Sequence, residues 1–439
     1  MPNWFLRELL AAALALSMSS AADSADAVSR LTAERLEAVH KAIQKLKTER
    51  RDVPRAGPLK EYRANLHVHS SLSHDSRGTI EEIVTAAKAA GTQVLMFTEH
   101  PAERYDYLRD GHQGTRDAVL LIPGAEMKGL LVYPRQSTRG NETGEPQDFS
   151  DLVRRQQGLT FLSHLEERMD WQIRGLTGVE IYNTHADFKD EKRLLASMRN
   201  PLWLLGTAEL FRKYPQEAFS ALHDYPADYL RRWDELCQKS PHTGVAANDA
   251  HQNIGLTVRL TENNKARIED GLGAKLLEVD AAGLAELGPA PKDAKPGSIL
   301  YQVRLDPYEN SLRHAGTHLL MPELTEKAVW DALNHGRAFV AFDWLADATG
   351  FDFAAESVSK RHEMGSRLKF AADLKLTGRS PLPGHWKLIR NGKLHSETTS
   401  ATLQSRLTEP GIYRAELWLD VAGEERVWVL SNPIYVEPK

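Results

Sequence analysis

The chain has 439 residues, of which 55 are basic and 60 acidic, so its formal net charge is −5 at neutral pH. Without an excess of positive charge, nucleic acid is not expected as the main partner. The single cysteine, Cys237, excludes an internal disulfide and a cluster of thiolate ligands, so a bound metal would be held by histidine and carboxylate groups.

Residues 1–27 are arranged like an export signal. Arg7 precedes an apolar run at 9–16, and Ala25-Asp26-Ala27 has the small-x-small pattern of a cleavage site. The apolar run is too short to span a bilayer, so no transmembrane segment is expected. We therefore predict a periplasmic or secreted protein cleaved after Ala27; the alternative is an ordinary N-terminal helix.

Residues 28–58 are expected to form an amphipathic helix and a linker. Leu36, Val39 and Ile43 recur at helical spacing between charged residues, which predicts one buried face packed on the following domain. Proline and glycine residues at 54–58 mark the linker.

A strand, a helix and a second strand are predicted next. His67 and His69 are two residues apart in the first strand, so both imidazoles point to one face and can bind one ion. Thr79 and Glu82 form a capping box that starts the helix. The apolar run at 94–97 is typical of a strand buried on both faces.

Polar residues able to bind a metal or a substrate follow each of these two strands and several later apolar runs. A parallel barrel brings the C-terminal ends of its strands to one mouth, so these side chains would converge. In chain order they are His74 and Asp75, Glu99 and His100, Glu126, His164, Asn183, and Asp249 with His251.

These motifs together resemble the PHP family, named for polymerase and histidinol phosphatase domains. The resemblance covers residues 61–252 and includes Thr98-Glu99-His100, Gly124-Ala125-Glu126, Ser163-His164 and Asp249-Ala250-His251. It implies an α/β fold, a distorted (β/α)7 barrel, with two or three divalent metal ions. The family usually hydrolyses phosphoesters.

The resemblance also assigns ligands by position. One ion would be held by His67, His69, Glu126 and Asp249, and another would lie among Asp75, His100 and His251. Glu126 would bridge to a third ion that His164 holds in part. Members with three ions have a further histidine shortly after the glutamate, but residues 127–133 contain none. We therefore expect two tightly bound ions and, at most, a weakly bound third.

Several residues near the predicted mouth have two interpretations. Glu99 either binds a metal or orients a ligand, and Asp75 is favoured over His74 as a ligand by its spacing. Asn183 either faces the site or caps the next helix, and His164 is either a ligand or a buried core histidine. The candidates for protonating a leaving group are His74, His185 and His223.

The imidazole and carboxylate ligands suit Zn, Mn or Fe. The leading hypothesis is a phosphoesterase for a small molecule, with a metal-bridged hydroxide as nucleophile and with Glu126, Asp249 and His251 in catalysis. One alternative is a hydrolase of carbamate or carboxyl esters at the same site. Another is a non-catalytic binding protein. The sequence does not predict the oligomeric state.

Two folded units are predicted from the length and a hydrophobic fraction of 41%. The barrel would occupy residues 59–300, with a helical insertion at 186–240. Residues 301–345 would form a connecting helix and strand, and 346–439 a small antiparallel β-sandwich. In that unit Asn391-Gly392 is a strong hairpin signal.

Overall fold

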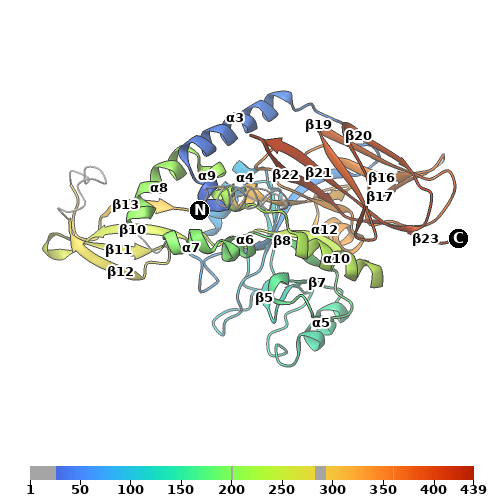
Figure 1. The fold of residues 1–439 in the computed structure, drawn as a ribbon. Coiled ribbons are helices and arrows are strands. Elements are labelled where there is room, and N and C mark those ends of the chain that lie inside the picture. Colours follow the sequence, from blue (N-terminus) through green and yellow to red (C-terminus); the bar gives the residue numbers. More distant parts are fainter. Residues whose placement is uncertain (1–25, 199–200, 282–292, 359) are drawn as a thin grey trace, which may run out of the picture.

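The computed structural model describes residues 26–198, 201–281, 293–358 and 360–439 as a mixed α/β protein (Figure 1). Within them, no helix combines the length and the apolar character needed to cross a membrane. The predicted export signal lies outside the described residues except for its last two positions, Asp26 and Ala27.

The barrel region consists of two half-sheets. In the first, β1 (Lys60–Val68) pairs in parallel with β2 (Val94–Phe97), which pairs in parallel with β4 (Val119–Ile122). On its other side β1 pairs with the antiparallel β14 (Gly316–Met321), and β14 with β15 (Ala338–Ala341). The short β3 (Gly114–Arg116) pairs with β4 at the edge.

The second half-sheet contains β5 (Ala125–Met127), β6 (Leu130–Tyr133), β7 (Leu159–Leu162), β8 (Gly178–Asn183) and β9 (Thr243–Ala247). Strands β7, β8 and β9 are parallel. Two isolated bridges, Val68 to Ala250 and Glu99 to Ala125, join the half-sheets. In the described residues, only these single bridges connect the two half-sheets, so the strand pairing is not continuous around a barrel.

Helices cover these sheets. The Thr79–Glu82 capping box is present at the start of α4 (Ile80–Ala90), as predicted. The predicted N-terminal helix is α3 (Ala33–Glu49), and it contacts α9 (Pro215–Phe219) and β21 (Gly411–Val421). The remaining helices are α2 (Ala27–Arg30), α5 (Pro146–Arg155), α6 (Thr184–Asp190), α7 (Lys192–Met198), α8 (Pro201–Lys213), α10 (Ala227–Lys239), α11 (Tyr308–His314) and α12 (Glu326–Asn334).

Four strands between positions 255 and 304 form a sheet of their own, whereas the sequence placed the stretch up to residue 300 in the barrel. Strands β10 (Gly255–Leu260), β11 (Lys265–Asp270), β12 (Lys275–Asp280) and β13 (Ile299–Arg304) pair in the order β12-β11-β10-β13. All three pairs are antiparallel. Figure 1 shows this sheet and the C-terminal strands at opposite ends of the molecule.

The C-terminal strand pairs are antiparallel as predicted, except that β18 (Arg367–Lys369) pairs in parallel with β23 (Ile434–Glu437), and the unit is not separate from the barrel region. Strand β22 (Glu424–Ser431) pairs with β15, so hydrogen bonding continues from the barrel half-sheet into this unit. The predicted hairpin joins β19 (Lys375–Arg390) to β20 (Lys393–Arg406), with Asn391 and Gly392 at positive φ. The other strands are β16 (Asp352–Glu356) and β17 (Arg361–Glu363).

A buried histidine lies where the two units join. His318 Nδ1 is 2.6 Å from Glu61 Oε1, and its Nε2 is 2.8 Å from Asp343 Oδ2. Burial alone would lower the pKa of His318, but the two carboxylates raise it to about 9. The histidine is therefore charged at neutral pH and balances buried negative charge.

This charge makes stability depend on pH. A pKa near 9 in the folded state, against 6.5 unfolded, stabilises the fold by about 3 kcal/mol below pH 6.5. That stabilisation is lost as the pH rises through 9. In urea unfolding, the difference in stability between wild type and His318→Gln should therefore shrink between pH 6.5 and 10. The exposed His335→Gln serves as control, and a pH-independent difference for His318→Gln would contradict the assignment.

Candidate metal centre

The predicted metal ligands lie at or just beyond strand ends and meet in one place. His67 is the second-last residue of β1, and His69 directly follows that strand. Glu126 lies in β5, and Asp249 lies two residues after the end of β9. His67 Nε2 is 3.2 Å from Glu126 Oε2 and 3.1 Å from Asp249 Oδ1. His69 Nε2 is 3.4 Å from the same Asp249 oxygen. One ligand atom of each residue lies within 4.8 Å of the others, close enough to surround one ion.

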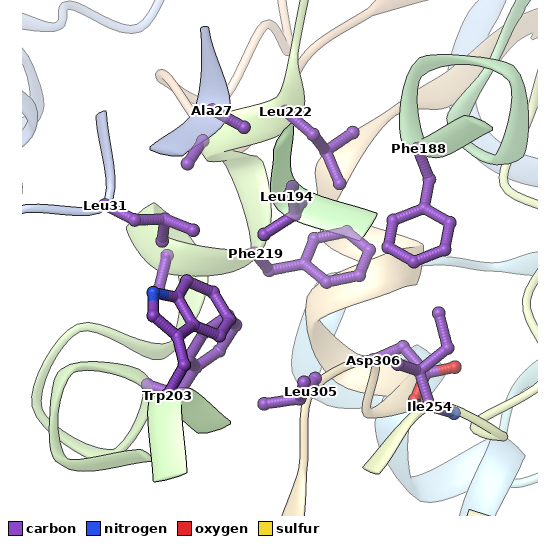
Figure 2. A pocket seen from close by; sticks show the side chains of 13 residues that line it. Ala27, Leu31, Phe188, Leu194, Trp203, Phe219, Leu222, Ile254, Leu305 and Asp306 are labelled. Carbon is purple, nitrogen blue, oxygen red and sulfur yellow. Dashed lines mark hydrogen bonds between the residues drawn. The ribbon is translucent and has the colours of Figure 1, made fainter. Parts of the chain in front are cut away.

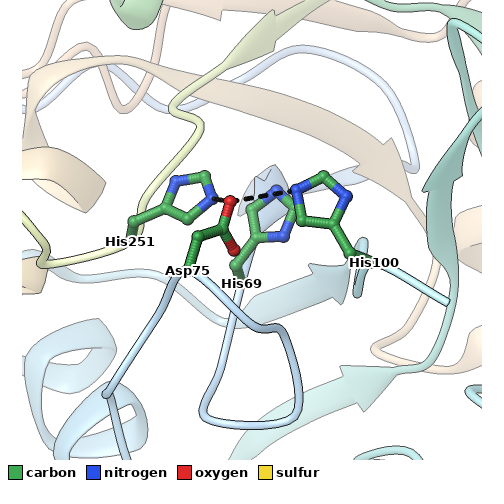
Figure 3. Close-up of side chains that lie close together, drawn as sticks. All are labelled: His69, Asp75, His100 and His251. Carbon is green, nitrogen blue, oxygen red and sulfur yellow. Dashed lines mark ion pairs between the residues drawn. The ribbon is translucent and has the colours of Figure 1, made fainter. Parts of the chain in front are cut away.

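A second group lies beside the first and shares His69 with it (Figure 3). Asp75 Oδ2 is 3.2 Å from His100 Nε2 and 3.3 Å from His251 Nε2. The ring of His69 stacks on that of His251 with 4.0 Å between centroids. The sequence assigned His69 to one ion only, but the geometry places it between two positions.

Unpartnered atoms in these groups fit bound metal ions. Among the described residues, His69 Nε2, His251 Nε2 and the Oδ1 atoms of Asp75 and Asp249 are buried without a hydrogen-bond partner. Buried polar atoms in folded proteins normally have partners. Imidazole nitrogens and carboxylate oxygens are suitable ligands for Zn, Mn or Fe, so the residues fit a centre of two ions.

Neighbouring acidic and basic side chains in the site shift one another's pKa values. Burial alone would raise the pKa of the Asp249 carboxyl, but His67 and His251 hold it well below its usual value. Burial alone would lower the pKa of His251, but Asp249 and Asp75 raise it to about 9. For His69, burial and the neighbouring His251 lower the pKa to about 3.

The backbone is constrained at two of these residues. Asp249 has a φ of 49° and His164 has a φ of 45°. Both values lie in the left-handed region, which residues other than glycine seldom adopt. Such conformations persist only where the surroundings enforce them, and they often accompany functional sites.

Glu99 belongs to neither group and instead contacts residues beside the predicted ligand His69. Its carboxylate accepts hydrogen bonds from the Ser70 backbone N–H at 3.1 Å and from Ser73 Oγ at 2.7 Å. Ser73 Oγ is also 3.2 Å from His69 Nδ1. Glu99 thus fixes the ring of His69 through Ser73, which matches one of its two predicted interpretations.

Glu180, which was not among the predicted site residues, links two of the predicted ligands. It is fully buried in β8, and its Oε1 is 2.7 Å from His67 Nδ1. Its Oε2 accepts the His164 backbone N–H at 2.8 Å and the Asn183 side-chain amide at 2.9 Å. A carboxylate within the otherwise apolar run 179–182 was the available signal.

The remaining candidates divide between the mouth and the interior. His164 Nε2 is 2.9 Å from Glu126 Oε1, and His185 Nδ1 is 3.5 Å from Asp249 Oδ2. His74 is exposed, with its ring 5.1 Å from that of His100. His223 is buried against Phe342 and Trp344, so the prediction that it could act at the mouth is wrong. Asn183 caps α6 by accepting the His185 backbone N–H.

An apolar cavity is also present, lined by Ala27 of α2, by helices of the insertion, and by Ile254, Leu305 and Asp306 (Figure 2). Its volume is about 40 Å³, whereas a cavity that holds benzene measures roughly 150 Å³. At its edge, Asp306 accepts the backbone N–H groups of Asn253 and Ile254, each at 2.9 Å. This cavity is too small for a substrate.

Comparisons with known proteins found a family match for the part of the chain that carries most of the predicted ligands. Residues 65–233 match the family model described as the PHP domain, a segment that contains every predicted ligand except Asp249 and His251. No curated protein matches the sequence. The chain is similar to the structure of a two-domain protein from Bacteroides vulgatus containing a predicted PHP-like metal-dependent phosphoesterase, with 13% identity and a TM-score of 0.37. That similarity covers 87% of this chain and 97% of the other.

Proposed function

We propose that this protein, whose residues 65–233 match the PHP domain model, is a metal-dependent hydrolase that cleaves a phosphoester of a small molecule. The observation that carries the proposal is the pair of ligand groups that share His69. Two adjacent divalent ions would activate water as the nucleophile and stabilise negative charge on the reacting phosphoryl oxygens.

The chain's own residues hold and orient this centre. Glu180 fixes His67, Ser73 fixes His69, and a backbone carbonyl at Asp249 accepts from His251 Nδ1 at 2.9 Å. Each of these rings therefore keeps its Nε2 towards the carboxylates of the site. The side chains of Asp75 and His100 are 27% exposed, so a substrate can reach the second group from solvent.

The leaving group requires a proton, and two histidines at the mouth can supply it. His74 lies beside His100, and His185, 40% exposed, lies beside Asp249. We assign the protonation step to one of these two residues.

A substrate screen tests the reaction class. The purified protein should hydrolyse bis(p-nitrophenyl) phosphate or p-nitrophenyl phosphate after loading with Mn²⁺, Zn²⁺ or Fe²⁺ and should lose this activity to a chelator. Faster turnover of carboxyl or carbamate esters would favour the alternative ester hydrolase. Metal binding with no turnover of any ester would favour a binding protein.

The number of ions is a separate prediction. Because His69 has one free ring nitrogen, it can bind only one ion, but each group keeps three other ligands. A third ion would rely on His164 and Glu126, with His185 or the substrate completing its shell. Catalytic zinc usually has three protein ligands, so a third ion should bind weakly. After exhaustive dialysis, elemental analysis should find two equivalents per chain. Retention of three would contradict this prediction.

We also propose export, with cleavage upstream of Asp26, for example after Ala22, where Ser20 and Ala22 keep the small-x-small pattern, instead of after Ala27. The Asp26 carboxylate caps α2 by accepting the Ser29 backbone N–H at 2.9 Å. Ala27 is fully buried, and its backbone N–H donates to Glu191 at 2.8 Å. A cut after Ala27 would remove both contacts. N-terminal sequencing of native protein should therefore give a start at or before Asp26; a start at Val28 would contradict the revised site, and a start at Met1 would contradict export.

A further inference from the structure

His164 is held in position by contacts on both its backbone and its ring. Its left-handed backbone is fixed by Glu180, which accepts its N–H at 2.8 Å, and by Arg168, which donates to its carbonyl at 3.1 Å. A residue in a sparsely populated conformation with this many partners is positioned, not merely packed.

The ring of His164 has the same arrangement as that of His67. In His67, Nδ1 lies 2.7 Å from Glu180, and Nε2 faces Glu126 and Asp249. In His164, Nδ1 lies 3.3 Å from Glu166 Oε1, and Nε2 lies 2.9 Å from Glu126 and 3.7 Å from Asp249. A carboxylate that accepts from Nδ1–H leaves the Nε2 lone pair free to bind a metal.

Glu166 is itself held from the helical insertion. Tyr229, in the first turn of α10 and 7% exposed, donates its hydroxyl to Glu166 Oε2. Tyr229 and Glu166 also line one cavity together with Asn183, whose side chain binds Glu180. The contacts thus run from α10 through Glu166 to His164 without a gap.

We propose that Glu166 and Tyr229 are positioning residues that set the metal affinity of His164, so that the helical insertion controls occupancy of the outer, third ion position. This inference rests on the proposed function because it assumes two tightly bound ions beside His164. It assigns a role to the insertion, which supplies no member of the two complete ligand groups.

A purely structural role for this pair predicts a different result. Loss of the Tyr229 hydroxyl would then lower thermal stability without changing metal binding. Tyr225 provides the matched control, because it lines the same cavity and its hydroxyl donates to Glu416 at 2.8 Å, away from the metal ligands. Tyr225→Phe and Tyr229→Phe each remove one oxygen atom and should both fold.

The experiment uses isothermal titration calorimetry to measure binding of further Mn²⁺ by protein that already holds two equivalents of Mn²⁺. Tyr229→Phe should weaken the third Mn²⁺ by about tenfold, in the range found when groups that orient metal ligands are removed. Tyr225→Phe should bind like wild type. Glu166→Gln, which keeps an acceptor oxygen, should bind more tightly than Glu166→Ala. Two equivalents should survive dialysis in all variants.

The outcomes separate the two proposals. Third-ion affinities equal to wild type in Tyr229→Phe and Glu166→Ala would overturn the positioning role. Uptake of two ions and no third by the wild-type protein would also overturn the positioning role, but it would leave the hydrolase proposal standing. Wild-type protein that binds no metal would overturn the proposed function itself. Equal weakening by Tyr225→Phe and Tyr229→Phe would show a general effect of packing and would also overturn the inference.

Discussion

Replacement of Asp249 by asparagine should abolish hydrolysis and reduce bound metal while the fold remains intact. One Asp249 oxygen lies 3.1 Å from His67 Nε2 and 3.4 Å from His69 Nε2, so it contacts the ligand that both groups share. Losing several kcal/mol of transition-state stabilisation corresponds to a rate reduced by about 10³-fold or more. Asparagine also tolerates the positive φ at this position better than alanine does.

The measurement combines turnover, metal content and thermal unfolding. His67→Ala and Asp249→Ala should also be inactive, with metal lost in step. Asp117→Asn is the matched control, since Asp117 also has a φ of 49° but is exposed and remote in the turn between β3 and β4. Full activity in Asp249→Asn or His67→Ala would place the reaction elsewhere in the molecule.

The parts of the site that could be predicted are those specified locally. Strand ends are marked by the switch from apolar to polar residues, so His67, Glu126 and Asp249 could be expected at one mouth. The capping box at Thr79 and the turn at Asn391 were equally accessible, because each depends on two or three neighbouring residues.

The parts that could not be predicted depend on contacts between distant segments. The pairing of β15 with β22 joins residues about ninety positions apart, and nothing in either strand specifies its partner. The separate sheet formed by β10, β11, β12 and β13 was not predicted, because the sequence of a half-buried strand does not specify which sheet the strand joins.

The same reason explains the errors at single residues. His223 lies in the helical insertion and His185 immediately precedes it, but only the packing shows that His223 is buried behind Phe342 and that His185 faces Asp249. Glu180 had a local signal, since a charge in a fully buried strand must find a partner. Its partner, His67, lies 113 residues away.

Replacement of Arg414 by alanine should have the largest effect on stability. Arg414 is 4% exposed, and its guanidinium donates to both oxygens of Asp234 on α10, at 2.9 and 2.8 Å. It also donates to Glu416 at 2.6 Å. Both carboxylates are buried, so the variant would leave two negative charges without their cation. Breaking a buried ion pair from one side typically costs about 3–5 kcal/mol.

Double-mutant analysis separates this cost from the net contribution of the pair. If buried charge causes the loss, Asp234→Asn should restore part of the stability of Arg414→Ala, because it removes one unpaired carboxylate with little change of shape. Urea unfolding of the single and double variants measures this coupling, with the exposed Arg231→Ala on the same helix as control. Additive losses would show that Arg414 acts by packing on Trp233, whose ring centre lies 5.7 Å from the guanidinium, and not through its charge. Because Asp234 lies on the helix that carries Tyr229, Arg414→Ala should also weaken the third metal ion, whereas Arg231→Ala should not.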